Sequence, residues 1–360
     1  MPARSSPSPR TGPPVDWVHD PLRIFAIGGG TGLSTLLKGL KKFAHQVGAT
    51  ALEPYVDITA MVTVTDDGGS SGRLRREFAM LPPGDVRNCM VALSEDEALL
   101  ARLFQYRFSS GRGLKGHSFG NLFLTALTQI TGDFARAVEL SSAVLAIAGR
   151  IFPSTRQNVS LRAHLADGRI VEGETRISRS GAPIARIDLM PASVRPSPGI
   201  LEAIARADLI TLGPGSLFTS VIPNLLVRGV ARAILRSPAW KVCILNLMSQ
   251  PGETTGLTAA DHVEAIHRHA RSPFLQFALA NTTPVARPAL TRYVRARAEQ
   301  VSLDRPRLED LGLNVIEMPL LARGEKIRHD PDRLAAAVID LALHSRRSRL
   351  IGGPLRRSSR

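Results

Sequence analysis

Cysteine and aromatic residues are scarce in this sequence of 360 residues, which has two cysteines, two tryptophans and three tyrosines. Two cysteines do not make a disulfide framework, and neither Cys89 nor Cys243 stands in a metal-ligand spacing such as C-x-x-C. Cys243 also lies within an apolar run typical of a strand. We therefore expect both cysteines to be small residues of the hydrophobic core.

Long hydrophobic runs are absent as well. No apolar segment approaches the roughly 20 residues that span a bilayer. The first 14 residues, rich in Ser, Pro and Arg, lack the apolar stretch of a secretory signal. Hydrophobic residues at 44% and charged residues at 21% are typical of a globular protein. We expect a cytoplasmic protein without a membrane span.

The charge is one-sided, with a formal net charge of +15. Six of these charges come from residues 344–360, which contain no acid, and the rest are spread through the chain without interleaved aromatic residues. A solvated basic tail and an anion-binding cleft account for this pattern as well as DNA would. Binding of nucleic acid through the tail stays open as a third interpretation, but we do not expect nucleic acid as the main partner.

We expect one domain, over residues 21–343, between two unstructured ends. Residues 1–20 and 344–360 are polar and basic and have little to bury. Removal of the basic tail should then leave the stability nearly unchanged.

Apolar strand patterns alternate with helical patterns through most of the domain. Expected strands lie at 22–27, 56–64, 209–212 and 241–248, and expected helices follow the first strand, cover most of 221–235 and begin at Pro331. Residues 150–197 differ, because the segments 159–166 and 169–175 flank Asp167-Gly168, a two-residue hairpin signal. The sequence therefore predicts an α/β fold with a Rossmann-like, mostly parallel sheet, helices on both faces and a small antiparallel β insert over 150–197.

The first strand ends in a glycine-rich run, residues 28–32, at the junction where doubly wound folds bind phosphate. Glycine lets the backbone approach a ligand, and the following helix directs free N–H groups toward an anion. The run is not the dinucleotide motif, because Leu33 stands at the position of its third glycine, and no Gly-Lys-Ser/Thr of a P-loop follows. A tight turn alone is the alternative. We favour phosphate binding by Gly29, Gly30, Thr31 and Gly32.

Two more glycine-rich loops follow strands. In one of them, Asp66 and Asp67 could accept hydrogen bonds from ribose hydroxyls or hold Mg²⁺ through water. The other, residues 213–216, leads into a helix and forms a second anion cradle. Two cradles suit a diphosphate better than a single phosphate. The candidate binding residues of these loops are Asp66, Asp67, Gly68, Ser70, Ser71, Gly213, Gly215, Ser216 and Thr219.

Three shorter polar segments complete the expected site. Arg87 is placed for a charge-assisted bond to phosphate or to an acid. A helix is expected to begin beside His117, and this histidine could equally cap the helix or contact a ligand. Another strand is expected to end near Asn246. The candidate residues of these segments are Arg87, Asn88, His117, Asn121, Asn246 and Gln250.

Taken together, these runs resemble the gluconeogenesis factor (YvcK-like) family. The similarity is carried by residues 62–74, 82–88, 116–121, 131–135 and 212–225, and extends over roughly 22–343. That family belongs with the 2-phospho-L-lactate transferases (CofD-like) of deazaflavin-cofactor synthesis, which share a Rossmann-like fold.

The resemblance implies a UDP-sugar ligand, typically UDP-N-acetylglucosamine, and a role in carbon metabolism, cell shape and the cell envelope, with protein partners in envelope regulation. It places Arg328 near the nucleotide sugar. In the transferase branch the equivalent of Asp66-Asp67 lies near a metal and the diphosphate, which makes Mg²⁺ the cofactor to consider. Leu257 stands where members often carry a tyrosine that could stack on the ligand. We also expect a homo-oligomer.

Two functions are consistent with these observations. In the first, the protein is a regulator that binds a UDP-sugar without converting it. In the second, it is a transferase that acts on a nucleoside diphosphate substrate, with Mg²⁺ neutralising the phosphates. No clear nucleophile or general base is legible in the sequence, which favours the regulator over the enzyme.

Overall fold

A computed structural model describes residues 20–44, 55–95, 99–324 and 326–351. Its centre is a seven-stranded parallel sheet with the order β10-β9-β8-β7-β1-β2-β3. The predicted fold class is confirmed. The strands are β1 (Leu22–Gly28), β2 (Val56–Val62), β3 (Arg150–Pro153), β7 (Leu209–Leu212), β8 (Trp240–Ile244), β9 (Phe277–Asn281) and β10 (Asn314–Met318).

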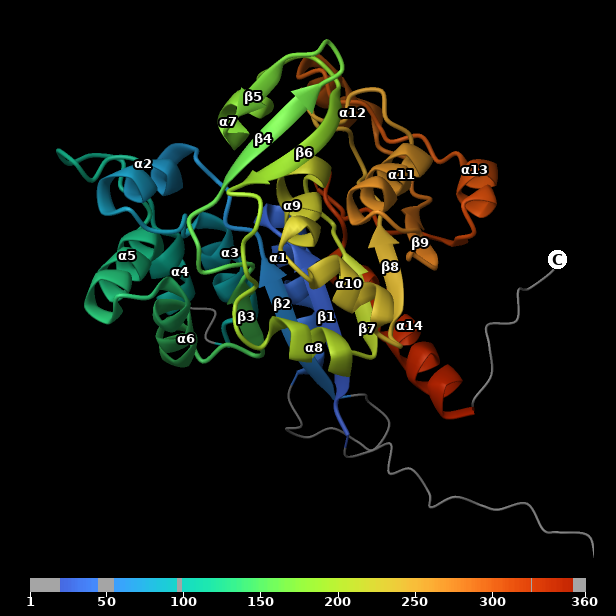
Figure 1. Ribbon diagram of the computed structural model, residues 1–360, viewed down its shortest axis with the longest axis horizontal. Helices are drawn as coiled ribbons and strands as arrows, with labels where there is room; N and C mark the ends of the chain where they lie inside the picture. Colours follow the sequence, from blue (N-terminus) through green and yellow to red (C-terminus); the bar gives the residue numbers. More distant parts are fainter. Residues whose placement is uncertain (1–19, 45–54, 96–98, 325, 352–360) are drawn as a thin grey trace, which may run out of the picture.

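Helices cover both faces of this sheet (Figure 1). On one face α1 packs between α3 and α14, and on the other α8 and α10 lie side by side. The helices are α1 (Gly30–Leu40), α2 (Gly69–Phe78), α3 (Gly84–Leu93), α4 (Leu100–Gln105), α5 (Phe119–Thr131), α6 (Phe134–Val144), α7 (Glu174–Ile177), α8 (Ile200–Arg206), α9 (Ile222–Leu226), α10 (Val230–Arg236), α11 (Ala259–Ala270), α12 (Arg287–Arg295), α13 (Arg305–Asp310) and α14 (Pro331–Ile351), with the short helical segments η1 (Lys41–Phe43) and η2 (Leu217–Val221).

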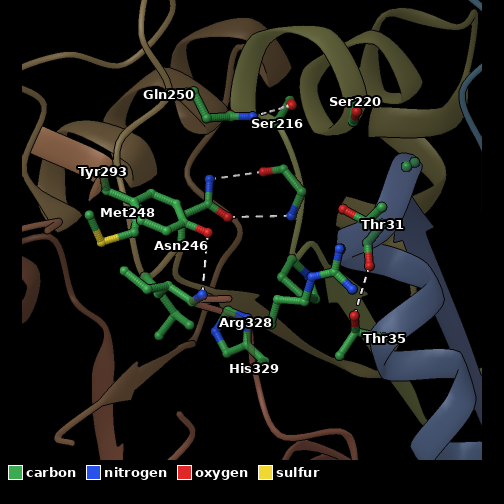
Figure 2. Close-up of a pocket in the computed structure, with 17 residues that line it drawn as sticks. Thr31, Thr35, Ser216, Ser220, Asn246, Met248, Gln250, Tyr293, Arg328 and His329 are labelled. Atoms are coloured by element: carbon green, nitrogen blue, oxygen red, sulfur yellow. Dashed lines mark hydrogen bonds between the residues drawn. The ribbon is translucent and has the colours of Figure 1, made fainter. Parts of the chain in front are cut away.

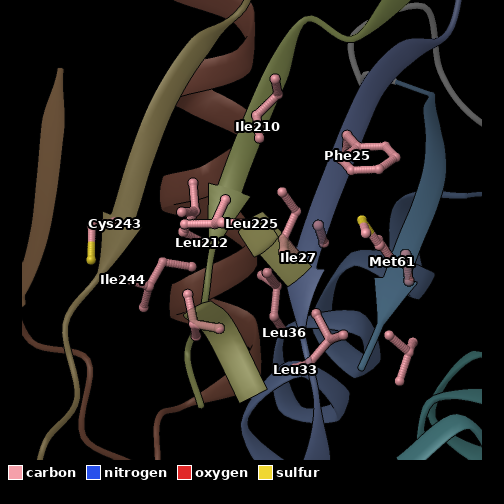
Figure 3. Close-up of a cluster of buried hydrophobic side chains, with 14 of the residues drawn as sticks. Phe25, Ile27, Leu33, Leu36, Met61, Ile210, Leu212, Leu225, Cys243 and Ile244 are labelled. Carbon is pink, nitrogen blue, oxygen red and sulfur yellow. The ribbon is translucent and has the colours of Figure 1, made fainter. Parts of the chain in front are cut away.

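The core forms where β1 and α1 meet. Phe25 and Ile27 of β1 and Leu33 and Leu36 of α1 are at most 1% exposed, and Figure 3 shows them beside Met61 of β2. Strands covered on both faces are apolar along their length, which is why the sequence pattern located these strands. Both cysteines are buried, as predicted.

The predicted antiparallel insert is present as β4 (Ser160–Leu165), β5 (Ile170–Glu172) and β6 (Ile184–Met190), in the order β5-β4-β6. The turn falls at Gly168, whose φ of 86° suits glycine. The predicted start of the insert is wrong, because residues 150–153 form β3 and pair in parallel with β2 in the main sheet.

Two expected strands and one expected helix need correction. The expected strands 56–64 and 241–248 end earlier, at Val62 and Ile244, where the chain turns into polar loops. The expected helix over 221–235 is divided into α9 and α10 by a turn at Gly229, which has a φ of 84°. Strands β9 and β10 were not predicted.

The basic end of the chain differs most from expectation. Helix α14 begins at Pro331 as predicted but runs to Ile351, so residues 344–351 are helical and not an unstructured tail. Arg346 and Arg349 form ion pairs with the buried Asp208, which sequence composition could not reveal. The rest of the tail, 352–360, and the predicted N-terminal arm up to residue 19 lie outside the described residues.

Across the ranges that the structure describes, no single helix is both long and apolar enough to cross a membrane, and one bent pair, 217–226 with 230–236, meets those criteria only in combination.

Candidate functional site

A cavity of about 220 Å³ lies at the carboxyl ends of β1, β7 and β8. Strand order reverses direction between β1 and β7, and such switch points are where doubly wound sheets bind ligands. We call this space the glycine-loop cavity (Figure 2). Nine of the predicted residues line it: Gly29, Gly30, Thr31, Gly32, Gly215, Ser216, Asn246, Gln250 and Arg328.

One wall of the glycine-loop cavity is the first turn of α1. Gly30 has a φ of 59°, a conformation that favours glycine. A Cβ atom on Gly32 would lie 2.3 Å from the carbonyl oxygen of Pro214, so this glycine lets two loops touch backbone to backbone. The N–H groups of a first helical turn have no acceptor within the helix and point toward the cavity end of α1. The Gly30 N–H is bound by Asp85, so the donors that this turn offers to an anion are the N–H groups of Thr31 and Gly32.

The opposite wall is the loop after β7. Gly213 has a φ of 83°, and Asn246, from the loop after β8, holds the turn at Gly215 from both sides. Its Nδ2 donates to the Gly215 carbonyl at 2.9 Å, and its Oδ1 accepts from the Gly215 N–H at 3.3 Å. Gln250 donates to the Ser216 hydroxyl. The glycine-loop cavity is thus built of fixed polar groups.

The remaining wall joins the predicted Arg328 to two residues that the sequence did not single out, Tyr293 and His329. Tyr293 of α12 lines the cavity and its hydroxyl accepts from the Ile327 N–H at 3.2 Å. Burial lowers the pKa of His329 to about 4, so this histidine is neutral at physiological pH. Figure 2 shows Arg328 extending toward Thr31 and Thr35 of α1. A lone tyrosine in an exposed helix gave no signal in the sequence.

Leu257 does not occupy the position expected of it. It packs as a partly buried residue against the hydrophobic core and is not among the residues that line the glycine-loop cavity. The aromatic ring of this cavity is Tyr293 instead. The absence of a tyrosine at position 257 therefore removes no ring from this cavity.

Arg87 and Asn88 line a second space, of about 570 Å³, which we call the basic cavity. It lies between α1, α3 and α4 and shares Thr31, Thr35 and Arg328 with the glycine-loop cavity. The predicted site is therefore divided between two adjoining spaces.

Five carboxylates gather behind the glycine loop, and we call them the carboxylate cluster: Asp66, Asp67, Asp85, Glu174 and Glu253. Burial raises the pKa of Asp85 to about 7, helped by the charge of Asp66, although Asp85 accepts the Gly30 N–H. Burial raises the pKa of Glu253 to about 7 and that of Glu174 well above its usual value. Only the first two of these five residues stood out in the sequence, because burial of the others depends on the fold.

The predicted Mg²⁺ ligands are already engaged by the protein. Asp67 accepts from the Thr175 N–H at 2.9 Å and from its hydroxyl at 2.5 Å, and Asp66 accepts from the Gly68 N–H at 2.9 Å. Within the described part of the chain, no group of three or more acidic, histidine or cysteine side chains is arranged to hold a metal ion. One oxygen of each aspartate is thus held by the protein, and Mg²⁺ binding by the pair stays a prediction.

Several other predicted residues lie behind the loops, within the protein. The Ser70 hydroxyl is 2.9 Å from His117 Nδ1 and accepts from Asn121 Nδ2 at 3.0 Å, which ties α2 to α5. Ser71 accepts from the Gly84 N–H at 3.2 Å, and Thr219 donates to Glu253 at 3.3 Å. These contacts give the five residues a supporting role around the loops.

The fold and the glycine-loop cavity define a doubly wound α/β protein with a ligand cavity at its topological switch point. Comparison with known proteins adds the family. Residues 24–321 match the family described as 2-phospho-L-lactate transferase CofD. The chain is 46% identical over 318 residues to the gluconeogenesis factor of Halalkalibacterium halodurans, covering 88% of this chain and 95% of that protein. It is 45% identical over 320 residues to the gluconeogenesis factor of Bacillus subtilis, covering 89% and 98%.

A solved structure agrees with these relatives. A crystal structure of a protein from Bacillus halodurans matches with a TM-score of 0.84 at 45% identity, covering 89% of this chain and 100% of that one. The chain belongs to the gluconeogenesis factors of the CofD family. The resemblance carried by the sequence motifs is confirmed.

Proposed function

We propose that the glycine-loop cavity binds a nucleoside diphosphate sugar, UDP-N-acetylglucosamine, and that the protein is a cytoplasmic regulator of carbon metabolism, cell shape and the cell envelope. One observation carries the proposal. The first turn of α1, the loop after β7 and Arg328 all border a single cavity at the switch point of the sheet. Backbone donors and a guanidinium around one cavity are groups that bind a diphosphate, which supports the proposal.

The lining of the glycine-loop cavity suits the other parts of such a ligand. Tyr293 offers a ring face for a base or a sugar. Gln250 Oε1 and His329 Nε2 have no hydrogen-bond partner within the described residues, so both could accept from a ligand. Because His329 is neutral, Arg328 is the cation that the diphosphate would meet.

The regulatory role has less direct support than binding. Its basis is the name of the relatives, gluconeogenesis factor, together with the absence of a legible nucleophile in the sequence. A homo-oligomeric state and protein partners in envelope regulation stay predictions.

A transferase activity is the second candidate, and the carboxylate cluster favours it. A carboxyl group with a pKa near 7, such as Asp85 or Glu253, suits a general acid or base at neutral pH. Asp85 also lies against the glycine loop, since a Cβ on Gly29 would come within 2.6 Å of its Oδ2. The family description, a 2-phospho-L-lactate transferase, is consistent with such chemistry.

Isothermal titration calorimetry of the full chain tests the binding proposal. We expect UDP-N-acetylglucosamine to bind with a micromolar Kd, about −8 kcal/mol. Arg328→Gln should weaken binding about 10- to 100-fold, because a hydrogen bond to a charged group contributes about 1.5–3 kcal/mol.

Arg323→Gln is the matched control, because Arg323 is exposed in the same connection and does not line the cavity. It should leave the Kd within about twofold of the wild-type value, as expected for an exposed residue. Equal affinities for wild type and Arg328→Gln would exclude a diphosphate bound beside Arg328.

A further inference from the structure

The basic cavity has a charge pattern that the proposed nucleotide site does not use. Five cationic side chains line it, and no acidic side chain does. They come from separate parts of the chain that meet around α1: Lys38, Lys41, Arg87, Arg107 and Arg328. A space of about 570 Å³ with such a lining is within the range of sites for small molecules.

Four of these cations, Lys38, Arg87, Arg107 and Arg328, form no ion pair within the part of the chain that the structure describes. Lys38, Arg107 and Arg328 are exposed, so water can solvate their charges. Water cannot solvate the charge of Arg87 in the same way, because Arg87 is only 8% exposed.

The guanidinium of Arg87 is incompletely paired. Its Nη2 donates to Asn88 Oδ1 at 2.6 Å and its Nη1 to the Phe104 carbonyl at 3.4 Å. Its Nε is buried without a hydrogen-bond partner among the described residues. Burial and the nearby charge of Arg107 lower the pKa of Arg87, against the smaller opposing effect of Asp85, which makes no ion-pair contact with it. A buried cation without an ion-pair contact is unfavourable, and a bound anion would compensate it.

The lining also indicates the size and chemistry of the anion. The Thr31 hydroxyl lies along α1, where the Ser34 and Thr35 hydroxyls donate to the Thr31 carbonyl, and Val91, Ala92 and Ala101 form an apolar side. Hydroxyls and guanidinium groups recognise phosphate, and the apolar side suits a short carbon skeleton. Because the cavity is lined by several cations and no acid, it suits an anion that carries more than one negative charge.

We propose that the basic cavity binds a second small anion, a metabolite with at least two phosphate charges, beside the nucleotide sugar. Arg328, Thr31 and Thr35 line both cavities, so the two ligands would share one guanidinium. Two anions on either side of one cation weaken each other, and this antagonism is reciprocal. The protein would then compare the levels of two metabolites. The antagonism rests on the proposed function, whereas anion binding in the basic cavity does not.

Inorganic pyrophosphate is the probe, titrated into the full chain with and without UDP-N-acetylglucosamine. We expect pyrophosphate to bind in the presence of saturating nucleotide sugar. It should raise the Kd of the nucleotide sugar about threefold to tenfold and then level off, because both ligands remain bound. The double variant Lys38→Gln/Arg107→Gln should weaken pyrophosphate binding at least about tenfold and leave the Kd of the nucleotide sugar unchanged.

Arg102→Gln/Arg112→Gln is the matched control, since it removes two exposed cations of the same region that do not line the basic cavity. It should bind pyrophosphate within about twofold of wild type. Equal losses in the two double variants would overturn the proposal, and so would the absence of pyrophosphate binding to wild type.

Competition gives a separate way to overturn it. If pyrophosphate raises the Kd of the nucleotide sugar without limit, the two compounds occupy one site and the basic cavity is only its phosphate end. If the nucleotide sugar does not bind at all, the proposed function fails. Loss of pyrophosphate binding in Lys38→Gln/Arg107→Gln alone would still support the basic cavity.

Discussion

Replacement of Asp208 by alanine should lower the free energy of unfolding by about 3–5 kcal/mol. Asp208 is 3% exposed and directly precedes β7. Its carboxylate accepts from the Arg23 N–H at 2.8 Å and from the guanidinium groups of Arg346 and Arg349 on α14. The alanine variant would leave the partly buried Arg346 and Arg349 without a carboxylate partner. Removal of one partner from a buried ion pair is strongly destabilising, because the other charge stays buried and uncompensated.

Urea denaturation followed by circular dichroism measures this loss. Glu139→Ala is the control, because it breaks an exposed pair with Arg136 and should cost less than about 1 kcal/mol. Similar losses in both variants would mean that the Asp208 contacts do not fasten α14. The same contacts reverse the expectation for the tail, because removal of residues 345–360 takes away both arginines and should destabilise the protein.

Asp85 should make the stability fall as the pH rises from about 4 to about 7, and Asp85→Asn should remove this contribution. The pKa of Asp85 is about 7 in the folded protein and 3.8 ordinarily, so the folded state holds a proton that the unfolded state has lost. Through Asp85, each increase in pH within that window therefore favours unfolding. Over the whole window the effect reaches up to about 4 kcal/mol.

Asparagine keeps an oxygen that can accept the Gly30 N–H while it removes the charge beside Asp66. Melting temperatures should therefore match wild type near pH 4 and exceed it at pH 8. Glu253, whose pKa is also about 7, keeps a residual slope in the variant. Asp340→Asn, on the exposed side of α14, should reproduce the wild-type profile. A difference in melting temperature between Asp85→Asn and wild type that does not grow from pH 5 to pH 8 would contradict the buried, protonated state of Asp85.

The sequence alone located those parts of the site that are marked by neighbouring residues in the chain. Gly29 to Gly32 and Gly213 to Ser216 each follow an apolar strand directly, and parallel strands bring their carboxyl ends to one edge. Tyr293 reaches the same cavity from α12, far along the chain, and no nearby residue marks it.

The sequence did not show which charged residues are buried or how they pair. Nothing in the sequence singled out Asp85 or Glu253, and their raised pKa values arise only when other elements cover them. Arg346 read as part of a solvated tail because its partner, Asp208, lies 138 residues away. Asp67 was a candidate for ribose or Mg²⁺, and the fold adds a role that the sequence did not show, because its Oδ1 fastens the insert through Thr175.

Phosphorus NMR of the full chain with UDP-N-acetylglucosamine tests the central claim most directly, because it reports both binding and turnover. We predict that equimolar protein shifts or broadens the two diphosphate resonances, and that Arg328→Gln reduces this change. We also predict no UMP, UDP or sugar phosphate after a day with Mg²⁺ and hydroxyl acceptors present. Unchanged resonances with wild-type protein would contradict nucleotide-sugar binding. Product that forms in proportion to the protein would replace the regulator with a transferase.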